Sequence, residues 1–281
     1  MAVLIKSAAA MDKFTAKLRK KNKTIGFVPT MGALHEGHIS LVREAKKRND
    51  AVIVSIFVNP TQFCPKEDLK KYPRDLKKDM KLLSRSGVDA VFHPSVREIY
   101  PGGFSTYIEV EGLYGKLCGA SRPGHFRGVA TVVAKLFNIV MPDAAYFGEK
   151  DFQQLAIIKK MVCDFHMGVD IISMPTIREA DGLAMSSRNS YLTEKEREKA
   201  PALFKALEFA KMLALEGVKE AKTIKAAMLK LINTEKGIRI DYVSVCDPET
   251  LEEKITVKGK TLIAIAAFIG KTRLIDNILI T

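Results

Sequence analysis

Tryptophan is absent from this 281-residue sequence, and no uncharged apolar run reaches the roughly 18 residues that a membrane-spanning helix needs. The longest apolar segment, residues 261–270, lies between Lys260 and Lys271. The first residues lack the order of a secretory signal peptide, because Lys6 interrupts the apolar stretch and basic residues follow it. We therefore expect neither a membrane span nor a signal peptide.

Cysteine is also scarce. The four cysteines are scattered along the chain and form no Cys-x-x-Cys pair; they are Cys64, Cys118, Cys163 and Cys246. This spacing provides neither a disulfide framework nor a zinc ribbon. We expect four free thiols in a protein of the reducing cytoplasm.

Positive charge is abundant and unevenly distributed. Residues 1–175 carry 27 Lys and Arg against 17 Asp and Glu, a net charge of +10, whereas residues 176–281 carry 18 against 15, a net of +3. A basic half suits anionic ligands, either small phosphates or nucleic acid, although lysine-rich clusters such as residues 19–21 and 46–48 are also typical of a solvated surface. A nucleic-acid-binding protein is the less favoured class, because the sequence has no aromatic-rich RNA motif.

Strands and helices alternate through the first 175 residues, which predicts a mostly parallel sheet covered by helices on both faces. The apolar fraction of 47% suffices for a real core. We expect strands at residues 24–28, 51–58, 88–92, 144–147 and 169–174, with a possible extra strand at 107–110. We expect helices at residues 8–20, from 39 onwards, and at 69–85, 129–140 and 152–164.

The second part has a different pattern. A capping box at residues 193–196 begins a helix that Pro201 interrupts or restarts, and helices then run to about 215 and from about 218 to 233. Three strands follow, at residues 238–245, 261–268 and 272–280. The fold class is therefore α/β, with a Rossmann-like nucleotide-binding domain at residues 1–175 and a smaller C-terminal α+β domain at 176–281.

The most informative stretch is FVPTMGALHEGH at residues 27–38. It predicts a buried strand, a glycine turn and the start of a helix on which His35 and His38 share one face. Unpaired N–H groups and the dipole at a helix start favour an anion, and Gly32 and Gly37 allow a ligand to approach the backbone. Two surface histidines or two thirds of a zinc site are the alternatives, and zinc is disfavoured because no third His or Cys lies nearby.

Two further polar clusters follow predicted strands. The first, residues 147–154, has Lys150 to point a cation at phosphates and Asp151 to accept from ribose hydroxyls, although a Gly-Glu-Lys-Asp turn is common on surfaces. The second, residues 181–189, has two hydroxyls and Arg188 in a loop with a glycine, which suits a triphosphate. Because ligands of such sheets bind beyond the carboxyl ends of the strands, the three clusters together predict one phosphate site.

A resemblance becomes specific at these clusters. The His-x-Gly-His and Ser-Ser-Arg segments are similar to those of the nucleotidylyl-transferase superfamily. The strings FVPTMGALHEGH, SIFVNPTQF, RPGHFRGV, FGEKDFQQ and DGLAMSSRN resemble the pantoate–β-alanine ligase family over essentially the whole chain. The resemblance implies an ATP-dependent ligase that condenses pantoate with β-alanine through a pantoyl-adenylate and releases AMP and pyrophosphate. It also implies Mg²⁺ with ATP, a homodimer, and no nucleic-acid or membrane partner.

The resemblance assigns residues as well. The implied catalytic residues are His35, His38, Lys150, Ser186, Ser187 and Arg188, with His38 as a proton donor. The implied ATP-binding residues are Met31, Gly32, Ala33, Leu34, His35, Glu36, Gly37, His38, Gly148, Glu149, Lys150, Asp151, Ile177, Met185, Ser186, Ser187 and Arg188. Pantoate and β-alanine would contact Gln62, Gln154, Pro29 and Met31. Arg122 and His125 match positions near the rim of the site, where helix capping and packing are the alternative roles.

Two positions depart from the family pattern. Cys64 stands where a small residue is expected, and Lys78 precedes Asp79 where some members have paired acidic residues. Asp79 is the candidate protein ligand of the metal. The loop at 181–189, where the two domains join, is the candidate lid over the adenylate. A relative that transfers AMP to a phosphate substrate is the alternative enzyme. One that loads tRNA is disfavoured by the small C-terminal part.

Overall fold

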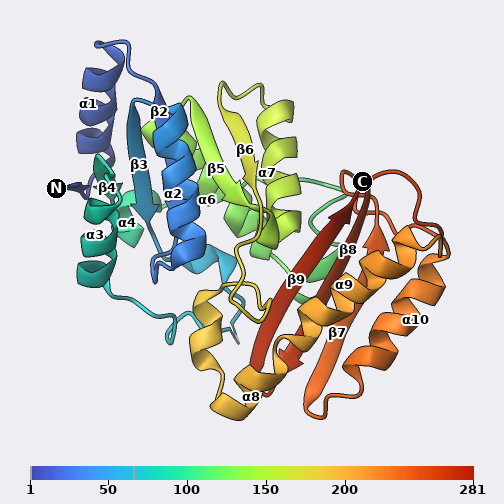
Figure 1. Ribbon diagram of the computed structural model, residues 1–281. Helices are drawn as coiled ribbons and strands as arrows, with labels where there is room; N and C mark the ends of the chain where they lie inside the picture. Colours follow the sequence, from blue (N-terminus) through green and yellow to red (C-terminus); the bar gives the residue numbers. More distant parts are fainter. Residues whose placement is uncertain (1, 66) are drawn as a thin grey trace.

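A computed structural model describes residues 2–65 and 67–281. Six parallel strands form the first sheet in the order β1-β4-β3-β2-β5-β6 (Figure 1). Their bounds are Val3–Ile5 (β1), Ile25–Thr30 (β2), Ala51–Ile56 (β3), Ala90–Phe92 (β4), Ala144–Gly148 (β5) and Asp170–Met174 (β6). The strand order reverses between β2 and β5, so the ligand crevice of this sheet is expected at their carboxyl ends.

Alternating residues of the strands give the sheet its two buried faces. Phe27 and Ile53 face one core and Val28 and Val54 the other. Helices α1 (Ala8–Arg19), α6 (His125–Val140) and α7 (Phe152–Asp164) cover the first face, and α2 (Glu36–Arg48) and α3 (Leu76–Arg85) cover the second. Short helices α4 (Val96–Ile99) and α5 (Leu117–Ser121) lie in the connections. No helix in the described part of the chain is long and apolar enough to span a membrane.

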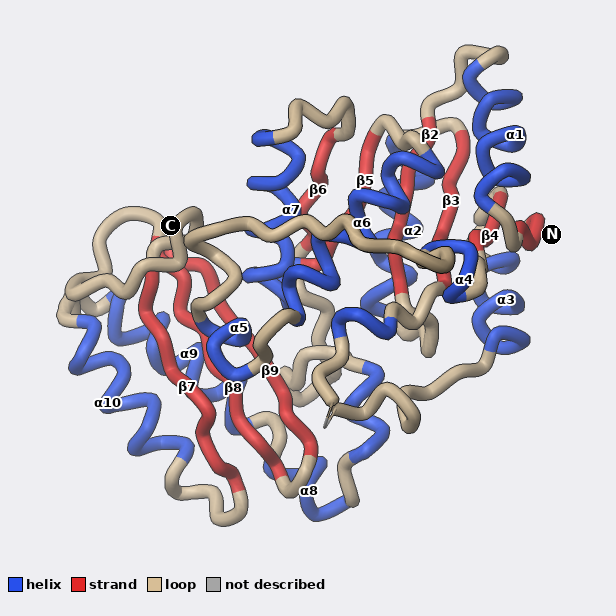
Figure 2. The backbone as a smooth tube through the Cα atoms, turned by 180° about the vertical axis from the view of Figure 1, so that it is seen from behind, coloured by secondary structure: helices blue, strands red, loops and turns tan. Residues whose placement is uncertain are grey.

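The C-terminal part has an antiparallel sheet of β7 (Ile238–Cys246), β8 (Thr261–Ile269) and β9 (Thr272–Ile280) in that order. After α8 (Glu194–Lys199), helices α9 (Ala202–Leu215) and α10 (Ala221–Ile232) pack on one face of this sheet. Residues of the opposite face, among them Leu262 and Ala264, join the core of the first domain. In both backbone views, β9 is the strand of this sheet nearest to the first sheet (Figures 1 and 2).

The predicted fold class is confirmed, as are most of the elements, including the capping box of α8; Ser7 caps α1. Two predictions were wrong, and one strand was missed. The helix expected at 69–85 begins only at Leu76, because Pro73 disfavours helix at the preceding residue and Asp75 caps the later start. Residues 107–110 form no strand, since the Ile108 N–H donates to Thr131 Oγ1 on α6. The short strand β1 was not predicted.

Candidate active site

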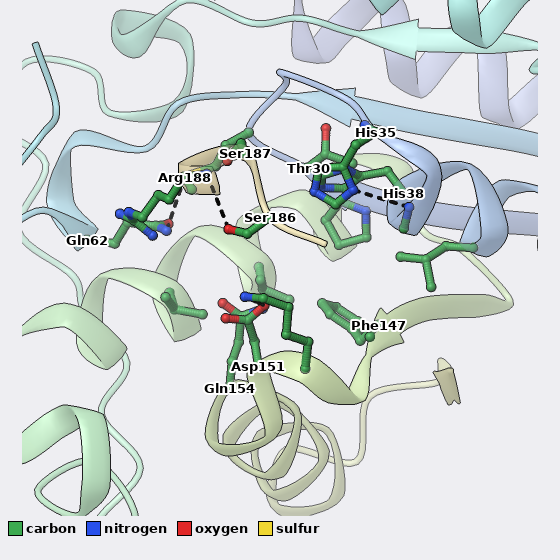
Figure 3. Close-up of a pocket in the computed structure, with 18 of the residues that line it drawn as sticks. Thr30, His35, His38, Gln62, Phe147, Asp151, Gln154, Ser186, Ser187 and Arg188 are labelled. Atoms are coloured by element: carbon green, nitrogen blue, oxygen red, sulfur yellow. Dashed lines mark hydrogen bonds and ion pairs between the residues drawn. The ribbon is translucent and has the colours of Figure 1, made fainter. Parts of the chain in front are cut away.

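The three polar clusters meet at the carboxyl ends of β2 and β5, where they line a cavity of about 230 Å³ (Figure 3). The predicted residues that line it are Pro29, Met31, His35, Gly37, His38, Gln62, Arg122, His125, Gly148, Lys150, Asp151, Gln154, Ile177, Met185, Ser186, Ser187 and Arg188. The predicted residues outside this lining are Gly32, Ala33, Leu34, Glu36 and Glu149. A second cavity of about 600 Å³ adjoins the first and shares Lys150, Asp151 and Arg188 with it.

The loop after β2 has an uncommon backbone. Gly32 has a φ of 83° and Ala33 a φ of 51°, a left-handed conformation that a residue with a Cβ seldom adopts. Asp79 of α3 holds this loop, because its carboxylate accepts hydrogen bonds from the N–H groups of Ala33 and Leu34, both at 2.9 Å. Asp79 lies outside the main cavity and both of its oxygens are engaged. Its geometry therefore favours a role in shaping the loop over a role as metal ligand.

His35 and His38 cap α2 with their own rings. The Gly37 N–H donates to His35 Nδ1 at 3.2 Å, and the His35 N–H donates to His38 Nδ1 at 3.3 Å, so the two side chains form a capping box. The expected free N–H groups at this helix start are thus partly used by the imidazoles. An acceptor role for Nδ1 leaves the ring proton on Nε2. Each histidine therefore offers one Nε2–H donor.

Glycine is required between the two histidines. A Cβ on Gly37 would lie 2.9 Å from His35 Cε1, closer than van der Waals contact allows. The two imidazole centroids are 4.1 Å apart, so the rings are in contact. The predicted shared face of the His-x-Gly-His segment is present, and Gly37 serves the packing of His35.

Both imidazoles are electrically neutral near pH 7. Burial, followed by the charge of Lys150, lowers the pKa of His35 to about 4. Burial and the adjacent His35 lower the pKa of His38 to about 3. Both rings are therefore neutral at pH 7, and each can offer its Nε2–H as a hydrogen-bond donor.

Lys150 supplies a cation on the opposite wall. It lies in a single 3₁₀ turn, Glu149–Asp151, between β5 and α7, and its Nζ is 3.8 Å from Asp151 Oδ2. Its side chain is 20% exposed and lines both cavities. In Figure 3, Asp151 and Gln154 project from this turn and the following helix toward the cavity.

The Ser-Ser-Arg loop closes a third side. The Met185 N–H donates to the Ile177 carbonyl at 2.9 Å, and Ser186 Oγ accepts from the Arg188 N–H, so the loop is folded back on the strand exit. The Arg188 guanidinium forms two hydrogen bonds with Asp68, at 3.1 and 3.2 Å. Ser187 Oγ lies 3.3 Å from Tyr72 Oη. Asp68 and Tyr72 were not singled out from the sequence; Tyr72 lies in the stretch expected to be helical, and Asp68 directly precedes it.

Gln62 lines the cavity and is held by several hydrogen bonds. Its Oε1 accepts from Asn59 Nδ2 at 3.0 Å, which orients the amide nitrogen toward Met31 Sδ at 3.3 Å. His125 Nδ1 lies 2.6 Å from the Gln62 carbonyl, and Arg122 Nη1 lies 2.9 Å from His125 Nε2. Arg122 also forms an ion pair with Glu67. The two predicted rim residues therefore support the Gln62 backbone. Asn59, which is 1% exposed, is a supporting residue that sequence reasoning missed.

A resident metal ion is not supported by the geometry. No group of three or more His, Cys, Asp or Glu side chains suited to a metal occurs among the residues described. Cys64 is half-buried on the second cavity, and burial raises the pKa of its thiol. The donor set therefore fits anionic groups of a substrate rather than a metal held by the protein alone.

Comparisons with known proteins agree with this geometry. The family model described as pantoate-beta-alanine ligase matches residues 3–279. A pantothenate synthetase of Thermotoga neapolitana is 56% identical over 98% of both chains, and one of Moorella thermoacetica is 54% identical over 99% of this chain and 98% of its own.

Solved structures agree as well. Pantothenate synthetase from Thermus thermophilus superposes with a TM-score of 0.93 at 44% identity, covering 98% of each chain. A pantoate–β-alanine ligase from Francisella tularensis, complexed with beta-gamma ATP and β-alanine, has a TM-score of 0.82 at 39% identity over 99% of this chain and 98% of its own. The chain described here belongs to the pantoate–β-alanine ligase family.

Proposed function

We propose that this enzyme activates pantoate with MgATP as a pantoyl-adenylate in the cavity between β2 and β5, and then transfers the pantoyl group to β-alanine. The observation that carries the proposal is the convergence of two neutral imidazole donors, the Lys150 ammonium and the Arg188 guanidinium on a single cavity that two glutamine amides also line. The Francisella relative, complexed with an ATP analogue and β-alanine, supports the same two substrates here.

The chemistry explains why such a site is needed. A carboxylate is a poor acyl donor, so one of its oxygens first attacks the α-phosphorus of ATP, and the bond from that phosphorus to the bridging oxygen breaks to release pyrophosphate. The amine of β-alanine then attacks the acyl carbon, and AMP leaves with the carboxylate oxygen. Charge accumulates on phosphoryl oxygens in the first step, so positioning and charge stabilisation are the main tasks of the protein.

Each charged or hydrogen-bonding group has a place in that task. The Nε2–H groups of His35 and His38 would donate to phosphoryl oxygens near α2. Lys150 and Arg188 would neutralise the leaving pyrophosphate, with Ser186 and Ser187 as additional donors. Preorganised donors of this kind contribute about 10²–10³-fold each to the rate in other enzymes.

We assign His38 to hydrogen-bond stabilisation of the transition state rather than to proton donation. Its pKa is lowered to about 3, and its Nδ1 already accepts a backbone N–H. No proton has to reach pyrophosphate when it leaves. A neutral Nε2–H donor is sufficient for the developing negative charge.

The opposite end suits pantoate. The amides of Gln62 and Gln154 provide donors and acceptors for two hydroxyls and a carboxylate. Four aliphatic side chains of α6 line the same cavity and suit the two methyl groups of this acid; they are Val129, Val132, Val133 and Leu136. Pro29 and Met31 form its mouth, and Ile177 lies where the adenine would meet backbone groups.

Mg²⁺ would arrive with ATP as part of the substrate. Mg²⁺ is usually held by substrate phosphates, water and one or two carboxylates. Asp151, which is exposed on both cavities, is the carboxylate placed for that contact, whereas Asp79 is engaged by the loop backbone. The ion would neutralise phosphate charge.

The proposal also covers the domain division, the oligomeric state, the location of the protein and the closure of one loop. We propose two structural units, residues 1–175 and 176–281, a homodimer, and residence in the cytoplasm, where the four free thiols stay reduced. The loop at 181–189 would close over the adenylate with the second unit. Sedimentation gives the oligomeric state. Protease protection of the loop that does not change with ATP and pantoate would contradict the lid.

Isotope transfer tests the adenylate directly. Pantoate labelled with ¹⁸O in its carboxylate is incubated with the enzyme, MgATP and β-alanine. The masses of the products are then measured by mass spectrometry. Attack on the α-phosphorus places one labelled oxygen in AMP. A label that appears in inorganic phosphate together with ADP would instead indicate an acyl phosphate and would overturn the proposal.

A further inference from the structure

Asn277 connects the C-terminal sheet to the turn that carries Lys150. Its side-chain Nδ2 donates to the carbonyl of Glu149 and to the carbonyl of Lys150, both at 2.9 Å. Asn277 lies on β9, pairs with Ala264 of β8 and is 8% exposed. One buried amide, with its two N–H groups, thus holds two successive carbonyls of the turn.

The turn has little other support from side chains. Asp151, which precedes α7, makes no side-chain cap hydrogen bond, and Gly148 before the 3₁₀ turn has no side chain to make one. Short 3₁₀ turns have poor internal hydrogen-bond geometry. The two bonds from Asn277 therefore fix the orientation of the backbone from which the Lys150 side chain extends.

The neighbouring residue anchors β9 at this place. Asp276, which is 4% exposed, pairs with Arg178 at 2.6 Å and accepts from the Asn277 N–H at 2.8 Å. Arg178 begins the segment that contains the Ser-Ser-Arg loop and also donates to the Gly182 carbonyl at 3.1 Å. The Arg178–Asp276 pair consequently holds the backbone of Asn277 in place.

We infer that Asn277 is a positioning residue for the reaction: through the Glu149 and Lys150 carbonyls it aims the Lys150 ammonium at the triphosphate. The inference rests on the role of Lys150 in the proposed function. Misplacement of a catalytic group by about 1 Å can cost on the order of 10²-fold in rate. Asn277 does not line the cavity proposed to hold the substrates, so its effect must disappear when Lys150 has no ammonium to aim.

A double-mutant cycle tests this. The variants are Asn277→Ala, Lys150→Ala and the pair together, measured as kcat/KM for ATP in pyrophosphate release from the full-length enzyme. We expect Asn277→Ala to lower this value about 10- to 100-fold in the wild-type background, and less than about threefold in the Lys150→Ala background. Equal losses in both backgrounds would overturn the inference.

Two controls keep the outcomes distinct. Asn233→Ala, at an exposed site that ends α10, should leave kcat/KM unchanged. Asn277→Asp is nearly isosteric, but it presents a carboxylate to the two carbonyls. It should therefore lose at least as much activity as Asn277→Ala. Activity near that of the wild type in a folded Asn277→Asp would overturn the inference. Normal activity of Lys150→Ala would instead contradict the role of Lys150 in the proposed function.

Thermal unfolding is recorded for every variant. If Asn277→Ala does not fold, Asn277→Ser replaces it in the cycle, because it removes the same amide and leaves a smaller gap. If Asn277→Ala lowers the stability of the protein and its loss of activity is not coupled to Lys150, Asn277 is only structural and the inference is overturned.

Discussion

Arg188 is paired with Asp68 through two hydrogen bonds, at 3.1 and 3.2 Å, between partly buried side chains. Burial alone would raise the pKa of Asp68, but the hydrogen bond and charge of Arg188 lower it. The guanidinium proposed to bind the triphosphate therefore has a carboxylate as its present partner. ATP must share or displace that carboxylate.

Removal of the Asp68 charge should favour ATP. An ion pair near the surface contributes about 0.2–1 kcal/mol, so Asp68→Asn should lower the Kd for an ATP analogue by a factor of about 1.4 to 5. Calorimetric titration gives this value. Asp164→Asn, which removes the partner of Lys160 on the surface, is the matched control and should change nothing. Weaker binding by Asp68→Asn would mean that Asp68 orients Arg188 for the nucleotide.

A hydrogen-bond role and an acid–base role of His38 predict different activities for the same variants. If its Nε2–H donates a hydrogen bond, His38→Ala should lose about 10²–10³-fold in the rate of pyrophosphate release, and His38→Gln should retain part of it, since its amide places a donor near the same point. Single-turnover kinetics with pantoate and ATP measures the rate. Equal, complete loss in both variants would favour an acid–base role.

Acid should destabilise the protein through His125. Burial lowers its pKa to about 4, whereas an unfolded histidine titrates near 6.5. Between these values the unfolded chain binds more protons, so stability is full above pH 6.5 and falls as the pH drops toward 4. From pH 7.5 to 5 this one group should cost about 2 kcal/mol. Urea unfolding at both values should show a smaller difference in His125→Gln, and an unchanged difference would contradict the shift.

Loss of one partner of the Arg178–Asp276 pair should destabilise the protein more than loss of both charges. Loss of one partner from a buried pair typically costs about 3–5 kcal/mol, because the other charge stays buried without a partner. Arg178→Ala should therefore destabilise strongly, and adding Asp276→Asn should recover at least about 1 kcal/mol in urea unfolding. Arg239→Ala is the matched control. It removes a comparable stacking contact, because Arg239 lies over Phe268 as Arg178 lies over Phe204, but it breaks no ion pair among the described residues. A double variant no more stable than Arg178→Ala would contradict the argument.

Much of the fold follows from local patterns in the sequence. The apolar runs of β2, β3 and β5 and the helices between them predict a parallel sheet, and the polar clusters after the strands predict the place of the site. The errors fall where local signals are weak. Strand β1 has only three residues, and the helix expected at 69–85 was predicted without the effect of Pro73, which disfavours helix before it. The resemblance to the ligase family then assigned roles that periodicity alone does not provide.

Long-range side-chain contacts were beyond sequence reasoning. Asp79 reaches the loop 45 residues before it, Asp68 meets Arg188, and Asn277 meets Lys150 from the far end of the chain. Nothing in the local pattern at these positions indicates a partner so distant. The neutral state of His35 and His38 likewise depends on burial and on neighbouring side chains, such as Lys150, that only the folded chain brings together.

Pyrophosphate release is the measurement closest to the central claim. Purified enzyme is mixed with MgATP and pantoate, first alone and then with β-alanine. The account predicts one rapid burst of pyrophosphate, equal to the active sites, with pantoate alone, and continuous release once β-alanine is present. No pyrophosphate until β-alanine is added would contradict an adenylate that forms before the amine reacts.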